Sequence, residues 1–200
     1  MWEAVIRILN GNKNDPIKLS ESHLFFCSGG TCNGGNTVSK TLNQCKKGVC
    51  LESSLPYRDV DQTCGQGIAN NWWLTARKLA SWQSTADRNQ MKTWLLQGPL
   101  VTTMTVHESF FNYVSGIYKS QGAQDPVAGG HCIGTFGGQD ALEYWIDRNS
   151  WNGWGENGYF RIAYGDSACD KAMYKLVPSS DPVPAPKKKL AICSLIPAFA

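Results

Sequence analysis

The spacing of apolar residues along this 200-residue chain changes near Pro99, and this change limits the folds open to it. Residues 2–9 place their apolar side chains at helical spacing. Residues 99–106 instead alternate and are rich in β-branched side chains, which predicts a strand. Further short strands, separated by Gly and Asn turns, are expected at 129–137, 143–149 and 158–164. The order predicts an α+β fold with a helical lobe followed by a β-rich lobe.

Start and stop signals divide the first part into helices and loops. Gly11 ends the first helix, Ser20 is a plausible N-cap for a second, and a third runs over 37–47 until Gly48. Residues 27–36 hold four Gly in ten positions and therefore form a loop. Two later stretches show no single regular spacing of apolar residues: 52–71 is irregular, and 72–97 is mixed and amphipathic.

These patterns suggest three segments. Residues 1–82 form the helical lobe, and residues 83–178 form the β-rich lobe. Residues 179–200 are rich in Pro and Lys and are expected to be a linker or a disordered tail.

Composition excludes several functions. The formal charge is +3, and the tail from Ser179 contributes +2 through three Lys and one Asp, so the body carries about +1 and nucleic-acid binding has no electrostatic support. No apolar run reaches the roughly 18 residues that a membrane span needs. Eight Cys are many for a cytosolic protein and favour an oxidising compartment.

Among the three histidines, His131 has the most informative surroundings. His23 and His107 are read as ordinary surface or boundary residues. His131 follows two Gly and opens an apolar strand, and Asn149 comes eighteen residues later. Two antiparallel strands would bring the Asn149 amide beside the His131 ring, which is the orienting half of a nucleophile–His–Asn triad.

Longer motifs around these residues resemble the papain-like cysteine peptidases. Gly-Gly-His-Cys-Ile-Gly-Thr-Phe-Gly-Gly at 129–138 resembles the family's His strand. Asn149-Ser150-Trp151 with 154–160 resembles its Asn-Ser-Trp … Trp-Gly-Glu block. Further matches, in the same order along the chain, lie at 19–21, 27, 32–35, 56–57, 98–100 and 116–118. The resemblance covers nearly the whole chain and implies the papain-like two-lobe fold, with a barrel-like antiparallel second lobe.

The resemblance implies a role for each matching residue around the His. His131 would be the general base and, as imidazolium, the partner of a Cys thiolate. Asn149 would orient its ring, and Trp151 would shield their hydrogen bond from water. Trp154 would line the leaving-group side, although the stretch 151–154 is one residue shorter than is usual in the family.

The resemblance also implies a substrate groove. Gly34 and Gly35 would let an extended peptide pair with their backbone groups. Gly130, before the His, leaves the pocket wall open, and Cys132 stands where the family has a small apolar residue.

Disulfides are likewise implied by the resemblance: Cys27 with Cys64, and Cys32 with a Cys outside the sequence. Cys45 and Cys50 flank a helix end, where the simple reading is a bond to each other. Cys169 matches a family position without a visible partner, and Cys193 lies in the tail.

The family nucleophile, in a Cys-Gly-Ser-Cys-Trp-like segment 130–150 residues before the His, is missing from the sequence. The oxyanion-hole Gln is missing as well. In one register Met1-Trp2 stands for Cys-Trp and Met1 replaces the nucleophile. In a second, favoured register, residues 3–8 match later turns of the same helix, and the Cys belongs about eight positions before Met1. Both leave this chain without a catalytic Cys, and we expect it to be an N-terminally truncated piece that is inactive alone.

Three functions remain open. The first is a cysteine-type endopeptidase acting on peptide or protein substrates, and the second is a non-catalytic homologue that binds peptides or a protein. A Trp-rich carbohydrate-binding module rests only on the eight Trp. No cofactor or metal is implied, a monomer is expected, and the cysteines favour a secreted or lysosomal/vacuolar location.

Overall fold

The computed structural model describes residues 1–186. Its α-helices are α1 (Trp2–Leu9), α2 (Glu21–Cys27), α3 (Val38–Lys47) and α4 (Arg88–Leu95). Its strands are β1 (Leu79–Thr85), β2 (Leu100–His107), β3 (Ile117–Tyr118), β4 (Val127–Gln139), β5 (Tyr144–Arg148), β6 (Tyr159–Ala163) and β7 (Met173–Pro178). Short 3-10 helices lie at Trp72–Leu74, Glu108–Asn112, Gly122–Gln124, Asp140–Leu142 and Asp166–Ala168.

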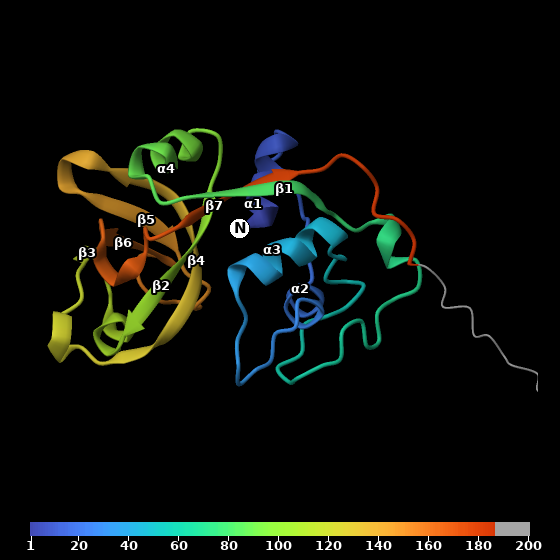
Figure 1. The fold of residues 1–200 in the computed structure, drawn as a ribbon, viewed down its shortest axis with the longest axis horizontal. Coiled ribbons are helices and arrows are strands. Elements are labelled where there is room, and N and C mark those ends of the chain that lie inside the picture. The colour runs from blue at the N-terminus through green and yellow to red at the C-terminus, as the bar shows by residue number, and fades with distance from the viewer. Residues whose placement is uncertain (187–200) are drawn as a thin grey trace, which may run out of the picture.

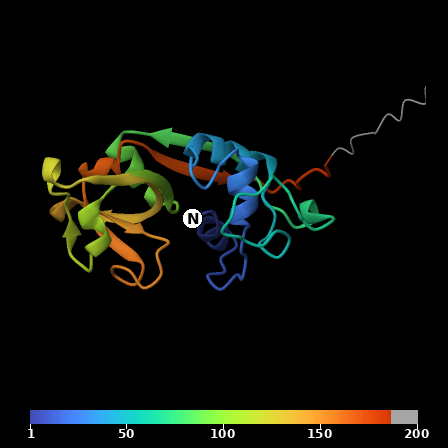
Figure 2. The same cartoon turned by 90° about the horizontal axis from the view of Figure 1, so that it is seen from below.

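The strands form one seven-stranded sheet in the order β1-β7-β2-β4-β5-β6-β3. Every pair is antiparallel except β3 with β6, which is parallel. Helices α1 to α3 lie at one end of the molecule and strands β2 to β6 at the other, and β1 and β7 run between them (Figures 1 and 2). The α+β, two-lobe prediction is therefore confirmed.

Two separate hydrophobic clusters occupy the two lobes. The cluster of the β-rich lobe contains Phe110, Trp145, Phe160 and Met173. The cluster of the helical lobe joins α1 and α3 to residues from much later in the chain, including Leu79, Val101 and Leu176. The helical lobe is thus completed by strands β1, β2 and β7, because residues 1–78 alone do not supply all of its apolar core. The boundary at residue 82 stays a prediction.

Local signals explain most of the helix ends. The Ser20 side chain accepts a hydrogen bond from the backbone N–H of His23 at 3.0 Å, which caps α2 as predicted. Gly48 ends α3 with φ 122°, a conformation that favours glycine. The mixed segment before Gly98 contains β1 and α4, and α4 is capped by the Asp87 side chain.

The first residues after β7 pack against the helical lobe, and the linker or disordered tail expected over 179–200 stays a prediction. The backbone N–H of Ser179 donates to the carbonyl of Lys78 at 3.0 Å. The Val183 side chain is buried and contacts Gly48. Residues 187–200, with Cys193, lie outside the described part of the chain. No helix within residues 1–186 is both long and apolar enough to cross a membrane.

Candidate active site

One predicted strand carries the His and the other leads to the Asn. These two strands are paired as expected, and their pairing brings the two side chains together. His131 lies on β4, and Asn149 directly follows β5, which pairs with β4 in antiparallel register. The Nε2 atom of His131 lies 2.9 Å from Oδ1 of Asn149. Asn149 is buried and His131 is half-buried, so the ring remains within reach of a substrate.

The hydrogen bonds of Asn149 determine which ring nitrogen of His131 carries the proton. The backbone N–H of Ser150 also donates to Asn149 Oδ1, at 2.7 Å, so this atom must be the amide oxygen. Because an oxygen only accepts here, His131 Nε2 must be the donor. In the neutral ring, Nδ1 then holds the lone pair, and it has no hydrogen bond within residues 1–186. The geometry leaves Nδ1 available as a base.

Aromatic rings cover this hydrogen bond. The rings of Trp151 and His131 are stacked, with centroids 5.2 Å apart and planes at 28°. Phe111 stacks on Trp151 in turn, at 5.3 Å and 19°. Trp154 lies edge-on to Trp151 at 5.2 Å and donates its indole N–H to the carbonyl of Phe111. Trp151 is therefore placed where it can exclude water from the His–Asn pair, and Trp154 supports it from behind.

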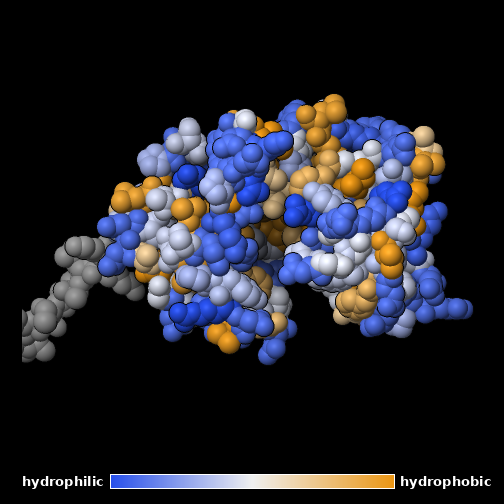
Figure 3. Space-filling model, turned by 180° about the vertical axis from the view of Figure 1, so that it is seen from behind, coloured by the Kyte–Doolittle hydropathy of each residue, from blue (hydrophilic) through white to orange (hydrophobic). Residues whose placement is uncertain are grey.

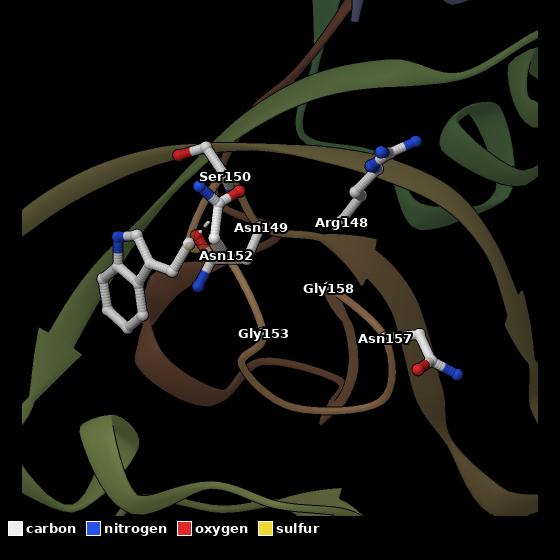
Figure 4. A pocket seen from close by; sticks show the side chains of 8 residues that line it. Arg148, Asn149, Ser150, Asn152, Gly153, Asn157 and Gly158 are labelled. Carbon is white, nitrogen blue, oxygen red and sulfur yellow. Dashed lines mark hydrogen bonds between the residues drawn. The ribbon is translucent and has the colours of Figure 1, made fainter.

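The loop between β5 and β6 surrounds a polar cavity of about 370 Å³ next to the pair. Figure 4 shows Asn149, Ser150 and Asn152 together on one side of this loop, and Arg148 and Asn157 pointing to the other. Figure 3 shows a separate hollow between the two lobes, with apolar side chains at its floor.

Glu156 anchors the same loop, a role that sequence reasoning did not assign to it. Its carboxylate forms an ion pair with Arg161 at 2.6 Å and accepts from the backbone N–H of Gly116 and the hydroxyl of Tyr113. These contacts, with the Arg161 hydrogen bonds first, hold the pKa of Glu156 below its usual value. Glu156 belongs to the Trp-Gly-Glu motif, but two of its partners, Tyr113 and Gly116, lie 43 and 40 residues before it in the sequence.

The groove glycines lie on a loop that closes on itself. The backbone N–H and carbonyl of Gly35 both pair with Thr31, at 2.8 and 3.3 Å, and the N–H of Gly34 donates to the Thr31 hydroxyl. The Gly35 N–H is therefore already used within the turn, whereas its carbonyl has a second lone pair that can still accept from a peptide. A side chain at Gly130 would meet open space, in line with an open pocket wall. The roles of these glycines stay predictions.

The cysteines behave partly as the resemblance implied. Cys27 and Cys64 form a disulfide, which confirms that pairing. Cys45 and Cys50 are both buried and free within residues 1–186, so the expected bond between them is wrong. Cys45 lies on the last turns of α3 and Cys50 after the α3 end, each packed into the core. Within the described residues Cys32, Cys132 and Cys169 are also free.

His23 is a buried residue, which corrects its reading as a surface or boundary histidine. It is 4% exposed, and its Nδ1 accepts the backbone N–H of Cys50 at 3.0 Å. Burial lowers the pKa of its ring. His107 is partly buried, with Nδ1 2.9 Å from the carbonyl of Asp125, consistent with a boundary residue.

Comparison with known proteins identifies the family of this chain. Residues 2–179 match the family model described as papain family cysteine protease. A cathepsin B-like protein, CP2, of Giardia intestinalis is 30% identical over 177 residues, covering 82% of this chain. A cathepsin B-like cysteine proteinase 4 of Caenorhabditis elegans is 44% identical over 201 residues, covering 80% of this chain. The chain belongs to the papain family of cysteine proteases.

Solved structures agree on the fold. A procathepsin B of Trypanosoma congolense has a TM-score of 0.71 at 20% identity, covering 88% of this chain and 65% of that one. A cysteine protease of Carica candamarcensis has a TM-score of 0.65 at 22% identity, covering 87% and 84%. The chain spans 58% of the length of both cathepsin B-like relatives.

Proposed function

We propose that His131 and Asn149 are the general base and the orienting residue of a cysteine-type peptidase. The hydrogen bond between His131 Nε2 and Asn149 Oδ1 carries this proposal, because it leaves Nδ1 as the free base under the cover of Trp151. The stacked indole keeps water from competing for that bond. A family member that only bound peptides would not need this arrangement.

The chemistry follows that of other thiol peptidases. A Cys thiolate, kept ionised by the His131 imidazolium, attacks the peptide carbonyl carbon, and the C–N bond then breaks. His131 gives its proton to the departing amine, and the acyl group stays on sulfur as a thioester. Water, deprotonated by His131, hydrolyses the thioester and returns the thiolate.

None of the free cysteines within residues 1–186 is suited to be this nucleophile. Cys132 neighbours His131 on β4, and adjacent strand residues point to opposite faces. Burial raises the pKa of Cys45 to about 12 and that of Cys50 to about 11, which opposes thiolate formation. Cys32 is exposed on the glycine loop, where a hydrogen bond with Asp61 raises its thiol pKa. We therefore propose that the 200-residue chain has no peptidase activity by itself.

The position of Met1 bears on the two possible registers. The Met1 methyl group lies against Gly134 of β4, three residues beyond His131 and on the opposite face of the strand. This supports the register in which Met1 does not stand for the nucleophile. The Glu3 carboxylate on α1 accepts a hydrogen bond from the backbone N–H of Leu19 at 2.9 Å. This bond connects α1 to the helical lobe.

We also propose peptides or proteins as substrates, a monomeric state, and a secreted or lysosomal/vacuolar location. The Cys27–Cys64 disulfide supports an oxidising compartment. The alternative of a non-catalytic peptide-binding homologue shares the fold and differs only at the nucleophile.

The coding DNA immediately before the Met1 codon tests these alternatives. A Gln codon followed closely by Cys-Gly-Ser-Cys-Trp supports the peptidase, and a Ser or Gly codon at that Cys position supports the non-catalytic homologue. At the protein level, an epoxide inhibitor directed at active-site thiols should label the extended protein and leave the 200-residue chain unlabelled. Epoxide labelling of this chain at any of its own cysteines would refute our account of the nucleophile.

A further inference from the structure

Asp147 is a carboxyl group enclosed in the core of the β-rich lobe. It is 0% exposed and lies on β5, opposite Thr135 of β4 and Phe160 of β6. Neither of its oxygens has a hydrogen-bond partner among the described residues, and the Thr135 hydroxyl has none either. A carboxylate in this place is costly, because burial removes its hydration without providing a compensating partner.

The surrounding groups increase this cost when Asp147 is charged. The nearest ionisable groups are the buried Cys169 thiol and the Asp170 carboxylate, which both follow the last 3-10 helix. Asp170 is already bound by Arg88 at 3.1 Å and by the indole N–H of Trp145 at 3.3 Å. From β4 and β6 only the neutral residues Thr135 and Phe160 stand opposite. No described cation faces Asp147, so its neutral form suits the site.

Asp147 is connected to the active-site pair through both strands that carry it. Asn149 is two residues further along the chain and directly follows the last residue of β5. Thr135, the cross-strand partner of Asp147, is four residues beyond His131 on β4. A disturbance at Asp147 would therefore act on β4 and β5 at the point where they align His131 with Asn149.

We propose that Asp147 is a positioning residue: its protonated form keeps β4 and β5 packed and the His131–Asn149 pair aligned, and its ionised form loosens them. The active-site pair is then best ordered under acidic conditions. This proposal rests on the proposed function for its meaning in catalysis, but the titration and its structural effect are independent of any activity.

The direction of the pH effect follows from proton linkage. Burial, reinforced by the nearby Asp170 carboxylate, raises the pKa of Asp147 from its usual 3.8 to about 7. Between these two values the folded protein holds a proton that the unfolded chain has released. The equilibrium constant for folding therefore falls by up to about tenfold for each unit of pH rise from roughly pH 4 to pH 7. Above that range Asp147 causes no further loss of stability.

His23 has an opposite effect in part of the same range. Its pKa is lowered by burial, so the unfolded chain binds the proton more readily, and stability falls as the pH drops below about 6.5. The net pH profile of the wild-type chain therefore mixes the two residues. Comparison of the wild type with Asp147→Asn separates them, because His23 is the same in both.

The experiment measures denaturant unfolding of the 200-residue chain and its Asp147→Asn variant at constant ionic strength. The unfolding constant of the wild type divided by that of Asp147→Asn should rise by at least about tenfold between about pH 5 and about pH 8. A ratio that stays constant over this range would overturn the proposal. Asp147→Val is a second variant, since Val suits a buried strand position.

Two measurements remain informative even if both variants fail to fold. The carboxyl carbon of Asp147 in the wild-type chain should titrate by NMR far above the usual 3.8, and an ordinary midpoint would overturn the proposal. Hydrogen exchange of the Asn149 amide, which donates to the Gly158 carbonyl at 2.8 Å, reports on the pair itself.

The exchange protection of the Asn149 amide should decrease above about pH 7, after correction for intrinsic exchange. The Val49 amide, bonded to Arg77 in the helical lobe, serves as an internal control and should keep its protection. Equal loss at both amides would mean global destabilisation and contradict a positioning role. If these results hold but the extended protein cleaves no peptide, the proposed function fails while the role of Asp147 stands.

Discussion

The indole of Trp151 lies stacked on the imidazole of His131, with ring centroids 5.2 Å apart, and the same imidazole is hydrogen-bonded to Asn149. This contact joins the polar pair to the aromatic cluster around Phe110. We propose that a ring in this place keeps bulk water away from the hydrogen bond, whose strength depends on a low local dielectric.

Replacement of Trp151 by Ala should therefore expose the hydrogen bond to water. We expect the Nε2 proton of His131 to exchange markedly faster in NMR spectra of Trp151→Ala, and the extended, active protein to lose roughly tenfold or more in kcat/KM. Trp151→Phe keeps an aromatic cover and should retain much of the protection. Equal exchange in the wild type and Trp151→Ala would show that the ring does not shield the pair.

Replacement of Asn149 by Ala should release the His131 ring. The wild-type ring should be mainly in the tautomer with the proton on Nε2, because the Asn149 oxygen accepts it. In Asn149→Ala we expect a mixture of tautomers by ¹⁵N NMR, and a loss of about 10²-fold in the activity of the extended protein. A wild-type ring with its proton on Nδ1 would contradict the assignment.

The Glu156–Arg161 ion pair should contribute measurably to stability at neutral pH. Its side chains are only 28% and 34% exposed, and Glu156 also accepts from Gly116 and Tyr113. Glu156→Gln should cost about 1–2 kcal/mol in denaturant unfolding. Because the folded pKa of Glu156 is lowered, its contribution is present above the usual 4.5 and is lost as the pH falls below it.

The difference in stability between wild type and Glu156→Gln should therefore shrink in acid. Lys18→Gln is a matched control, since the Lys18–Glu52 pair has a longer separation of 3.7 Å and a 60% exposed Lys. It should change stability by less than about 0.5 kcal/mol. Similar losses in both variants would argue against a special role for Glu156.

Removal of the Cys27–Cys64 disulfide should destabilise the helical lobe. The two residues are separated by 37 positions, so the cross-link restricts a long loop of the unfolded chain. We expect Cys27→Ser/Cys64→Ser, or reduction of the wild type, to cost about 3–4 kcal/mol in the free energy of unfolding. An unchanged melting temperature after complete reduction would contradict this.

Thiol labelling should distinguish the exposed cysteines from the buried ones. In a Cys193→Ser background, iodoacetamide should modify Cys32 and Cys132 in the native chain and leave Cys45, Cys50 and Cys169 unmodified until denaturant is added. Mass spectrometry of peptides identifies the sites. A disulfide between Cys45 and Cys50 in non-reduced peptides would restore the rejected pairing.

Much of the fold was predictable because it depends on local patterns. Residues 2–9, 37–47 and 99–106 carry their secondary structure in their own spacing, and each forms within one or two residues of its predicted place. The mixed stretch before Gly98 was not predictable, because β1 is a strand only through its pairing with β7, far along the chain. The parallel pairing of β3 with β6 likewise has no local signal.

The candidate site shows the same division. Residue type and spacing mark the groups available for chemistry, namely His131 between a Gly pair and an apolar strand and Asn149 before its Trp. The pairing of Cys27 with Cys64 was implied by the family resemblance. Tertiary contacts were needed to establish that Nε2 is the donor, that Gly35 is engaged by Thr31, that His23 is buried, and that Asp147 has no hydrogen-bond partner among residues 1–186. The physical reason is that residue type and spacing encode local conformation, whereas hydrogen-bond partners and burial depend on segments that meet only when the chain folds.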